Sequence, residues 1–309
     1  MSGRIVISGA GGQLGVWLAG LATDRARDVL ALTSSQWDIT DPAAADRIIQ
    51  SGDVVVNCAA YTNVDDAESH EAAAYAVNAT GPEHLARACA RVGARLIHVS
   101  TDYVFTGEPV TGDPAEGGPR PYEPSDETDA RGVYALSKLA GERAVLAALP
   151  DASDGIVVRT AWLYTGGTGK DFVAVMRRLA AGDGPVNVVD DQIGSPTYVA
   201  DLAVALLQVA DDRVPGPILH AANEGAVSRF GQARAVFEEC GADPERVRPV
   251  STDQYPRPAP RPTYSALGGR ESAAAGLTPL RPWRPALVAA LAASRSDAVA
   301  VRPLPSTRD

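Results

Sequence analysis

The chain has 309 residues, of which 45% are hydrophobic, and a formal net charge of −10. This length and composition allow one large α/β domain with a smaller appendage, and the acidic balance argues against general affinity for nucleic acid. No apolar run approaches a membrane span and the N-terminus has no signal-type hydrophobic region, so we expect a cytoplasmic protein with no membrane contact. The three cysteines lack metal-ligand spacing and are expected to be reduced.

The chain starts with a strand, a glycine turn and a helix. Residues 4–8 (RIVIS) form a β-branched run, GAGGQLG follows at 9–15, and residues 16–21 are mostly apolar. This order is the context that a dinucleotide-binding fingerprint requires, because glycines admit a pyrophosphate and the helix N-terminus offers N–H groups to it. Leu14 occupies the usual place of the last fingerprint glycine. A purely structural hairpin is the alternative if no further strand–helix units follow.

Further units do follow. We expect strands at 29–33, 54–58, 96–100, 156–159 and 218–221, and helices at 42–50, 66–91 and 133–149. This alternation predicts an α/β fold, a doubly wound parallel-sheet Rossmann domain whose apolar strands are buried on both faces. Ligands of such sheets lie at the carboxyl ends of the strands, where residues 9–15, 59–62 and 100–103 would meet.

The chain beyond residue 160 is less regular. We expect helices at 172–181, 199–209, 230–240 and 285–293, a loop at 166–169, a turn-rich segment at 190–197 and a non-helical Arg-Pro segment at 257–262. The predicted Rossmann domain comprises residues 1–160 with returning segments near 198–222. A smaller α/β substrate-binding domain comprises 161–197 and 223–293, and a disordered tail covers 294–309.

Tyr134 and Lys138 stand four residues apart in the predicted helix at 133–149, and Lys138 is one of only two lysines in the chain. Residues i and i+4 share a helix face, so the ammonium can favour ionisation of the phenol and lower its pKa. A tyrosine of this kind can donate a proton to a carbonyl oxygen. The alternative is a chance pair on a solvated helix.

Several motifs occur in an order that is typical of one family. They are GAGGQLG (9–15), AAYTNVDDAE (59–68), VNATG (77–81), STDYVF (100–105), YALSKLAGE (134–142), VRTAWLY (158–164), DQIGSPT (191–197) and RPTYSAL (261–267). Together they resemble the dTDP-4-dehydrorhamnose reductase family of the extended short-chain dehydrogenases. The resemblance implies NAD(P)H-dependent reduction of the C4 ketone of dTDP-4-dehydro-L-rhamnose to dTDP-L-rhamnose, a step in cell-envelope polysaccharide biosynthesis.

The resemblance also implies roles for individual residues. Thr101, Tyr134 and Lys138 correspond to the catalytic set, and Asp102, Tyr103 and Trp162 to the sugar site. Besides Tyr134 and Lys138, the implied cofactor-binding residues are Gly9, Gly11, Gly12, Gln13, Leu14, Gly15, Asp38, Ile39, Ala59, Ala60 and Thr62. Asn78 is expected to order the helix beside the active site. The alternatives are purely structural roles: a turn cap for Thr101, helix packing for Tyr134 and a core position for Trp162.

The expected cofactor is NADPH, with NADH also accepted, because residues 32–35 (LTSS) offer neither an acidic residue to repel a 2′-phosphate nor an arginine to bind it. Two positions depart from the family pattern. Asp171 replaces a usual asparagine and brings a carboxylate near the diphosphate unless Lys170 or an arginine neutralises it. Trp17 replaces a glutamate that bridges a divalent metal in some dimeric relatives, so we expect no metal, and a monomer or a homodimer.

Two other functions remain open from the sequence. A non-catalytic binding protein of the type of the methionine adenosyltransferase regulatory subunit has this fold and fingerprint. A nucleotide-sugar 4-epimerase uses the same tyrosine and lysine with tightly bound NAD. The sugar-site motifs favour the reductase.

Overall fold

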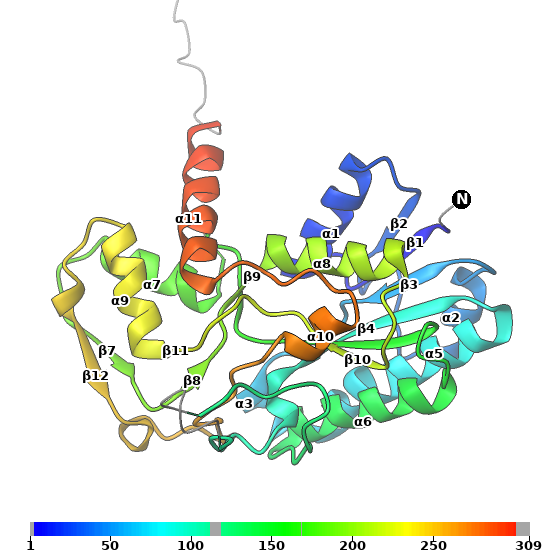
Figure 1. Cartoon of the computed structure of the whole chain (residues 1–309), viewed down its shortest axis with the longest axis horizontal. Coiled ribbons are helices and arrows are strands. Elements are labelled where there is room, and N and C mark those ends of the chain that lie inside the picture. Colours follow the sequence, from blue (N-terminus) through cyan, green and yellow to red (C-terminus); the bar gives the residue numbers. More distant parts are fainter. Residues whose placement is uncertain (1–2, 112–118, 168, 301–309) are drawn as a thin grey trace, which may run out of the picture.

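Six short apolar strands pair in parallel to form the central sheet of the structure, a computed structural model that describes residues 3–111, 119–167 and 169–300 (Figure 1). The strands are β1 (Ile5–Ser8), β2 (Val29–Leu32), β3 (Val54–Asn57), β4 (Arg95–Thr101), β5 (Gly155–Thr160) and β10 (Ile218–His220). All six were predicted from their apolar sequences, and the expected α/β Rossmann class is confirmed.

The sheet order is β10-β5-β4-β3-β1-β2. The chain therefore moves outward from β1 to β2 and then returns to β3 on the other side of β1. Neighbouring crossovers separate at this switch point, which leaves a crevice at the carboxyl ends of β1 and β3. The glycine turn follows β1 directly, so it lies at that crevice.

Helices cover both faces of the sheet (Figure 1). One face carries α1 (Gln13–Asp24) and α8 (Val199–Asp212), which pack on each other, and the other carries α2 (Pro42–Ile48), α5 (Gly81–Val92) and α6 (Val133–Ala148). Successive residues of β1 alternate between the two apolar cores, because Ile5 and Ile7 join the α1/α8 side and Val6 joins the α2/α5 side.

The single helix predicted over 66–91 is wrong. The structure has α3 (Val64–Ala67), α4 (Glu71–Tyr75), a π-helical segment (Ala76–Thr80) and then α5. Pro82 lies in the first turn of α5 and cannot donate to the carbonyl four residues earlier, that of Asn78. That carbonyl instead faces α6, where a Cβ at Gly141 would lie 2.1 Å from it. The π-helical segment lies where the regular α-helical hydrogen bonding is interrupted in this way.

The rest of the chain forms a smaller α/β layer beside the sheet (Figure 1). It contains α7 (Phe172–Ala180), α9 (Arg229–Glu239), α10 (Arg270–Ala274) and α11 (Trp283–Ala300), the parallel pair β7 (Val186–Val189) and β12 (Val247–Val250), the antiparallel pair β8 (Ile193–Gly194) and β11 (Val227–Ser228), and the parallel pair β6 (Leu163–Tyr164) and β9 (Thr197–Tyr198). The predicted helices are present. The β7/β12 pair was not predicted, because Pro249 argues against a strand unless that strand lies at an edge.

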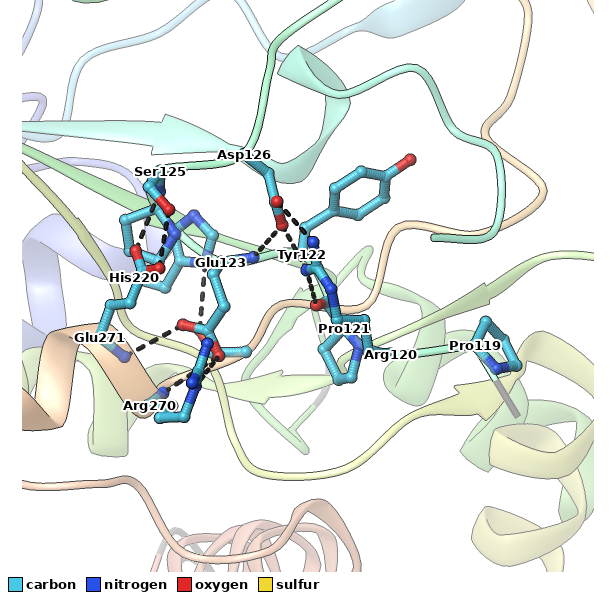
Figure 2. Close-up of polar contacts among 12 residues, drawn as sticks. Pro119, Arg120, Pro121, Tyr122, Glu123, Ser125, Asp126, His220, Arg270 and Glu271 are labelled. Atoms are coloured by element: carbon cyan, nitrogen blue, oxygen red, sulfur yellow. Dashed lines mark hydrogen bonds and ion pairs between the residues drawn. The ribbon is translucent and has the colours of Figure 1, made fainter. Parts of the chain in front are cut away.

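The segment at 119–126 is tied to α10 by polar contacts (Figure 2). Arg120 forms a two-pronged ion pair with Asp126, with N–O distances of 2.6 Å. Ser125 donates to the Glu271 carboxylate from its backbone N–H at 3.0 Å and its hydroxyl at 2.7 Å. The Glu123 carboxylate accepts the N–H of Glu271 at 3.1 Å. The contacts with Glu271 join parts of the chain that are about 150 residues apart in sequence.

The C-terminal helix is longer than predicted. α11 continues to Ala300, so the expectation of an irregular chain from residue 294 is wrong for 294–300. The segment LAASRSDAVA contains no glycine or proline, and the first proline follows at position 303. The remainder of the predicted tail, 301–309, lies outside the described residues. In the described part of the chain, none of the helices combines the length and apolar character needed to cross a bilayer.

Candidate active site

A cleft of about 1150 Å³ opens at the carboxyl ends of the strands. Every predicted cofactor-binding residue lines it, together with Thr101, Asp102 and Trp162. Tyr103 is the exception, because it lines a neighbouring pocket with Arg261 and packs edge-on against Tyr134 at a centroid distance of 5.6 Å. Lys138 and Lys170, the only lysines in the chain, both line the cleft.

The glycine turn is shaped for close approach of another backbone. Gly9 has φ +68°, and a Cβ there would lie 2.6 Å from the backbone nitrogen of Ala59. A Cβ at Gly15 would lie 2.4 Å from the Gly9 carbonyl oxygen. Gly12 caps α1 without a side-chain acceptor, so N–H groups of the first turn face the cleft without a side-chain partner. These features fit the diphosphate of a dinucleotide.

The adenosine end of the cleft is bordered by the chain after β2. Thr33 and Ser34 line it, and Asp38 follows. The Asp38 carboxylate accepts from the Thr40 hydroxyl at 2.7 Å and from the Thr40 N–H at 2.9 Å, and these two hydrogen bonds lower its pKa. Ile39 is buried against Gly81 of α5. The side chains therefore fix the shape of this end without placing an arginine on it.

Thr101, the last residue of β4, links the groups around the candidate reaction centre. Its hydroxyl accepts the N–H of Tyr103 at 3.2 Å and donates to Asp102 Oδ1 at 3.1 Å. Asp102 Oδ2 accepts from the hydroxyl of Ser265 at 2.5 Å. Burial raises the pKa of Asp102 to about 6, against the opposing effect of these hydrogen bonds. Thr101 does cap a turn, which is the structural role expected of it as an alternative, but it also lines the cleft.

The Tyr134 phenol also belongs to this group. Burial raises its pKa, and a hydrogen bond with Thr101 lowers it in part. The expectation that Lys138 holds this pKa low is therefore not met in the structure. The physical reason is that desolvation disfavours phenolate more than the surrounding groups stabilise it. The half-buried phenol is kept protonated, which is the form that a proton donor needs.

Lys138 is buried beneath the cleft floor, next to β4. Its Nζ donates to the Val99 carbonyl at 2.8 Å and lies 3.3 Å from His98 Nε2. Burial lowers the pKa of Lys138 to about 8, while Glu142 and Cys58 act in the opposite direction. His98 was not predicted as a site residue. Within strand β4 it occupies an ordinary core position, so no local sequence pattern marks it as a site residue.

A half-buried arginine was also missed. The guanidinium of Arg229, at the start of α9, lies 3.5 Å from the centre of the Trp162 ring and 4.9 Å from that of Phe172. Burial lowers the pKa of Arg229 to about 10, against favourable interactions with Tyr103 and Asp102. Trp162 is half-buried and lines the cleft, so it is not simply a core residue. The arrangement presents an aromatic face and a cation beside the candidate sugar site.

The Asp171 carboxylate is stabilised by groups other than the lysine or arginine that we expected. Its carboxylate caps α7 by accepting the N–H of Ala174 at 3.0 Å. The other oxygen accepts from the Thr165 hydroxyl at 2.9 Å and from Gln13 Nε2 at 3.1 Å. Neutral donors and the helix N-terminus stabilise the charge, rather than a neighbouring lysine or arginine.

Asn78 orders the loop that borders the cleft. Its side chain pairs with both backbone groups of Tyr61, at 2.8 and 3.1 Å, and donates to the Ser137 hydroxyl of α6 at 3.1 Å. The side chain is fully buried. Asn78 therefore joins the segment 59–62 to the helix that carries Tyr134 and Lys138.

Trp17, at the position where some relatives have a metal-bridging glutamate, packs edge-on against Tyr198 at 5.9 Å. Over residues 3–111, 119–167 and 169–300, no group of three or more His, Cys, Asp or Glu side chains is placed to hold a metal ion.

The parallel sheet, the glycine turn and the Thr–Tyr–Lys set in one cleft define an oxidoreductase of the short-chain dehydrogenase type with a Rossmann fold. Residues 3–296 match the model of the RmlD substrate binding domain family, so the chain belongs to that family and the expected resemblance is confirmed. The chain is 73% identical to a dTDP-4-dehydrorhamnose reductase of Mycobacterium tuberculosis over 100% of this chain and 99% of the relative.

Two solved structures agree. The dTDP-4-dehydrorhamnose reductase of Clostridium acetobutylicum has a TM-score of 0.86 and 35% identity, covering 94% of this chain and 99% of that one. The Bacillus anthracis enzyme, solved in complex with NADP, has a TM-score of 0.83 and 34% identity, covering 93% of this chain and 98% of that one.

Proposed function

We propose that this chain is an NADPH-dependent reductase that converts dTDP-4-dehydro-L-rhamnose to dTDP-L-rhamnose by reducing the C4 ketone. The observation that carries this proposal is that Thr101, Tyr134 and Lys138 line the same cleft as the glycine turn. A dinucleotide held at the turn and a sugar held near Trp162 would meet beside the candidate proton donor. The proposal places the enzyme in the cytoplasm, in dTDP-rhamnose biosynthesis.

The residues of the chain supply binding, orientation and a proton. Bound NADPH would supply the hydride for the ketone carbon. The protonated Tyr134 phenol donates a proton to the ketone oxygen, and the Thr101 hydroxyl helps to orient that oxygen. Thr101 is oriented in turn by Asp102. Lys138, held between the Val99 carbonyl and His98, supplies a titratable amine one helical turn after Tyr134 on α6.

The sugar site is proposed to lie between Asp102 and Trp162. A carboxylate accepts hydrogen bonds from sugar hydroxyls, and an indole face packs against the apolar side of a deoxy sugar ring. Arg229 stacks on the Trp162 and Phe172 rings and so holds the Trp162 ring in place. A Cβ at Gly194 would lie 2.5 Å from that ring, so the ring is held from a second side. Such a rigid platform favours one orientation of the sugar.

A spectrophotometric assay tests the function. We expect purified protein to oxidise NADPH with dTDP-4-dehydro-L-rhamnose, and to do so much faster than with dTDP-4-keto-6-deoxyglucose. NADH should support a slower reaction. Co-purification of tightly bound NAD with interconversion of nucleotide sugars would instead support the 4-epimerase, and no turnover with either ketone would support the binding protein.

A further inference from the structure

A chain of buried polar side chains lies behind Lys138, away from the cleft. The Ser8 hydroxyl is 2.6 Å from Asn57 Oδ1, and Asn57 Nδ2 is 3.0 Å from His98 Nδ1. His98 Nε2 is 3.3 Å from Lys138 Nζ. Ser8, Asn57 and His98 are fully buried at the carboxyl-end halves of three neighbouring strands, β1, β3 and β4.

The orientation of the Asn57 amide is fixed by a backbone donor. Asn57 Oδ1 accepts the N–H of Ala59 at 3.1 Å as well as the Ser8 hydroxyl. A backbone N–H can only donate, so the atom that faces Ala59 must be the amide oxygen. The amide nitrogen of Asn57 then faces His98 and donates to Nδ1.

This donation fixes the tautomer of His98. A neutral imidazole that accepts at Nδ1 carries its proton on Nε2. The imidazole is neutral because burial lowers the pKa of His98 well below its ordinary value. The Nε2–H group therefore faces Lys138 Nζ. An ammonium has no lone pair to accept this hydrogen, whereas a neutral amine has one.

We propose that His98 is a positioning residue that donates from Nε2 to the neutral amine of Lys138, so that Asn57 and His98 together favour the deprotonated form of this lysine. The remaining hydrogen-bond partner of Nζ, the Val99 carbonyl, accepts from either form and does not discriminate between them. The proposal concerns the protonation states of His98 and Lys138. It rests on the proposed function only for its consequence in catalysis.

The other groups that face Lys138 do not reverse this preference. Glu142, on the same helix, favours the ammonium, but Arg159 binds its carboxylate at 2.8 and 3.0 Å. The Cys58 thiol, after β3, is held protonated because burial raises its pKa to about 12. Burial lowers the pKa of Lys138 to about 8, in the same direction as the effect proposed for His98.

The consequence for catalysis concerns proton return. After Tyr134 has given its proton to the substrate, a proton must come back to the phenolate. An amine that changes its protonation state near neutral pH can lose a proton and regain one without a large energetic cost. His98 Nε2–H stabilises Lys138 in the form that remains after the proton has left.

Two NMR measurements on the full chain without added nucleotide test the proposal. The chain has four histidines, so long-range proton–nitrogen spectra can report each tautomer, and His98→Gln assigns the His98 signals. We expect His98 to carry its proton on Nε2. The chain has two lysines, so ¹³Cε labelling gives two titration curves, and Lys170→Arg assigns them. We expect the Lys138 midpoint to lie at least about one pH unit below that of Lys170.

Asn57→Asp should reverse the pattern. A carboxylate at this position accepts from Nδ1–H, which leaves Nε2 to accept from an ammonium, and the Lys138 midpoint should rise by about one pH unit or more. Ser8→Ala is the matched control, because the Ala59 N–H still fixes the amide and the midpoint should stay within a few tenths of a pH unit.

A proton on His98 Nδ1, a Lys138 midpoint equal to that of Lys170, or an unmoved midpoint in folded Asn57→Asp would each overturn the proposal. If Asn57→Asp does not fold, the two wild-type measurements decide. None of these measurements depends on turnover. A protein that is inactive as a reductase but shows the expected titration would therefore contradict the proposed function and leave the proposed role of His98 intact.

Discussion

Tyr134 is held as a protonated phenol by its surroundings, and that is the form required of the proposed proton donor. Tyr134→Phe should lower kcat by roughly 10² or more, because the ketone oxygen loses its proton source, while binding of NADPH changes little. Steady-state kinetics and NADPH fluorescence titration measure the two quantities. Near-normal turnover in a folded variant would contradict the assignment.

Lys138→Arg should also lower kcat, because a planar guanidinium does not fit between the Val99 carbonyl and His98 Nε2.

Asp102 gives the site a predicted pH dependence. Burial raises its pKa to about 6, so the carboxyl is protonated below that pH and its ability to accept from a sugar hydroxyl decreases. We expect kcat/KM to rise as the pH increases through about 6, with a loss on the order of tenfold between pH 7 and pH 5. Asp102→Asn should be slower at every pH and should lack this acidic limb. An unchanged limb in the variant would assign the titration to another group.

Elements defined by local sequence were predictable, whereas features that depend on distant partners were not. The apolar strands and the glycine turn follow from neighbouring residues. The family resemblance implied that Thr101, Tyr134 and Lys138 act together, and all three line one cleft. The break in the predicted helix at 66–91 depends on Gly141, about 60 residues away, as well as on Pro82. The site residue Arg229 is defined by its stacking on Trp162, and no local pattern marks such a pair.

The turn after β2 carries the prediction for cofactor choice. Ser34 lines the cleft there, and Ser34→Asp would place a carboxylate where a 2′-phosphate is expected. NADPH should lose roughly tenfold or more in kcat/KM, about 1.4 kcal/mol, while NADH is comparatively spared. Ser35→Asp is the matched control, because the substitution adds the same charge at a residue that does not line the cleft. If Ser34→Asp left the preference unaltered, the adenosine ribose would not lie at the end of β2.

Contacts between the sheet and the smaller layer border the cleft. Gln13 at the start of α1 donates to the Asp171 carboxylate at the start of α7, at 3.1 Å. The N-termini of both helices thus face the same end of the cleft, near the glycine turn. Two helix N-termini favour an anionic group between them, whereas the Asp171 carboxylate disfavours it.

Asp171→Asn separates these two effects. Asparagine caps a helix about as well as aspartate, so the melting temperature should change little. Removal of the half-exposed charge should tighten NADPH binding by a few fold at low salt, on the order of 0.5–1 kcal/mol, and less at high salt because the interaction is screened. Calorimetric titration at two salt concentrations measures both effects. Asp171→Ala is the control, because it removes the same charge but also the cap, and should cost about 0.5–2 kcal/mol of stability. Unchanged NADPH affinity in Asp171→Asn at low salt would mean that the diphosphate does not lie between α1 and α7.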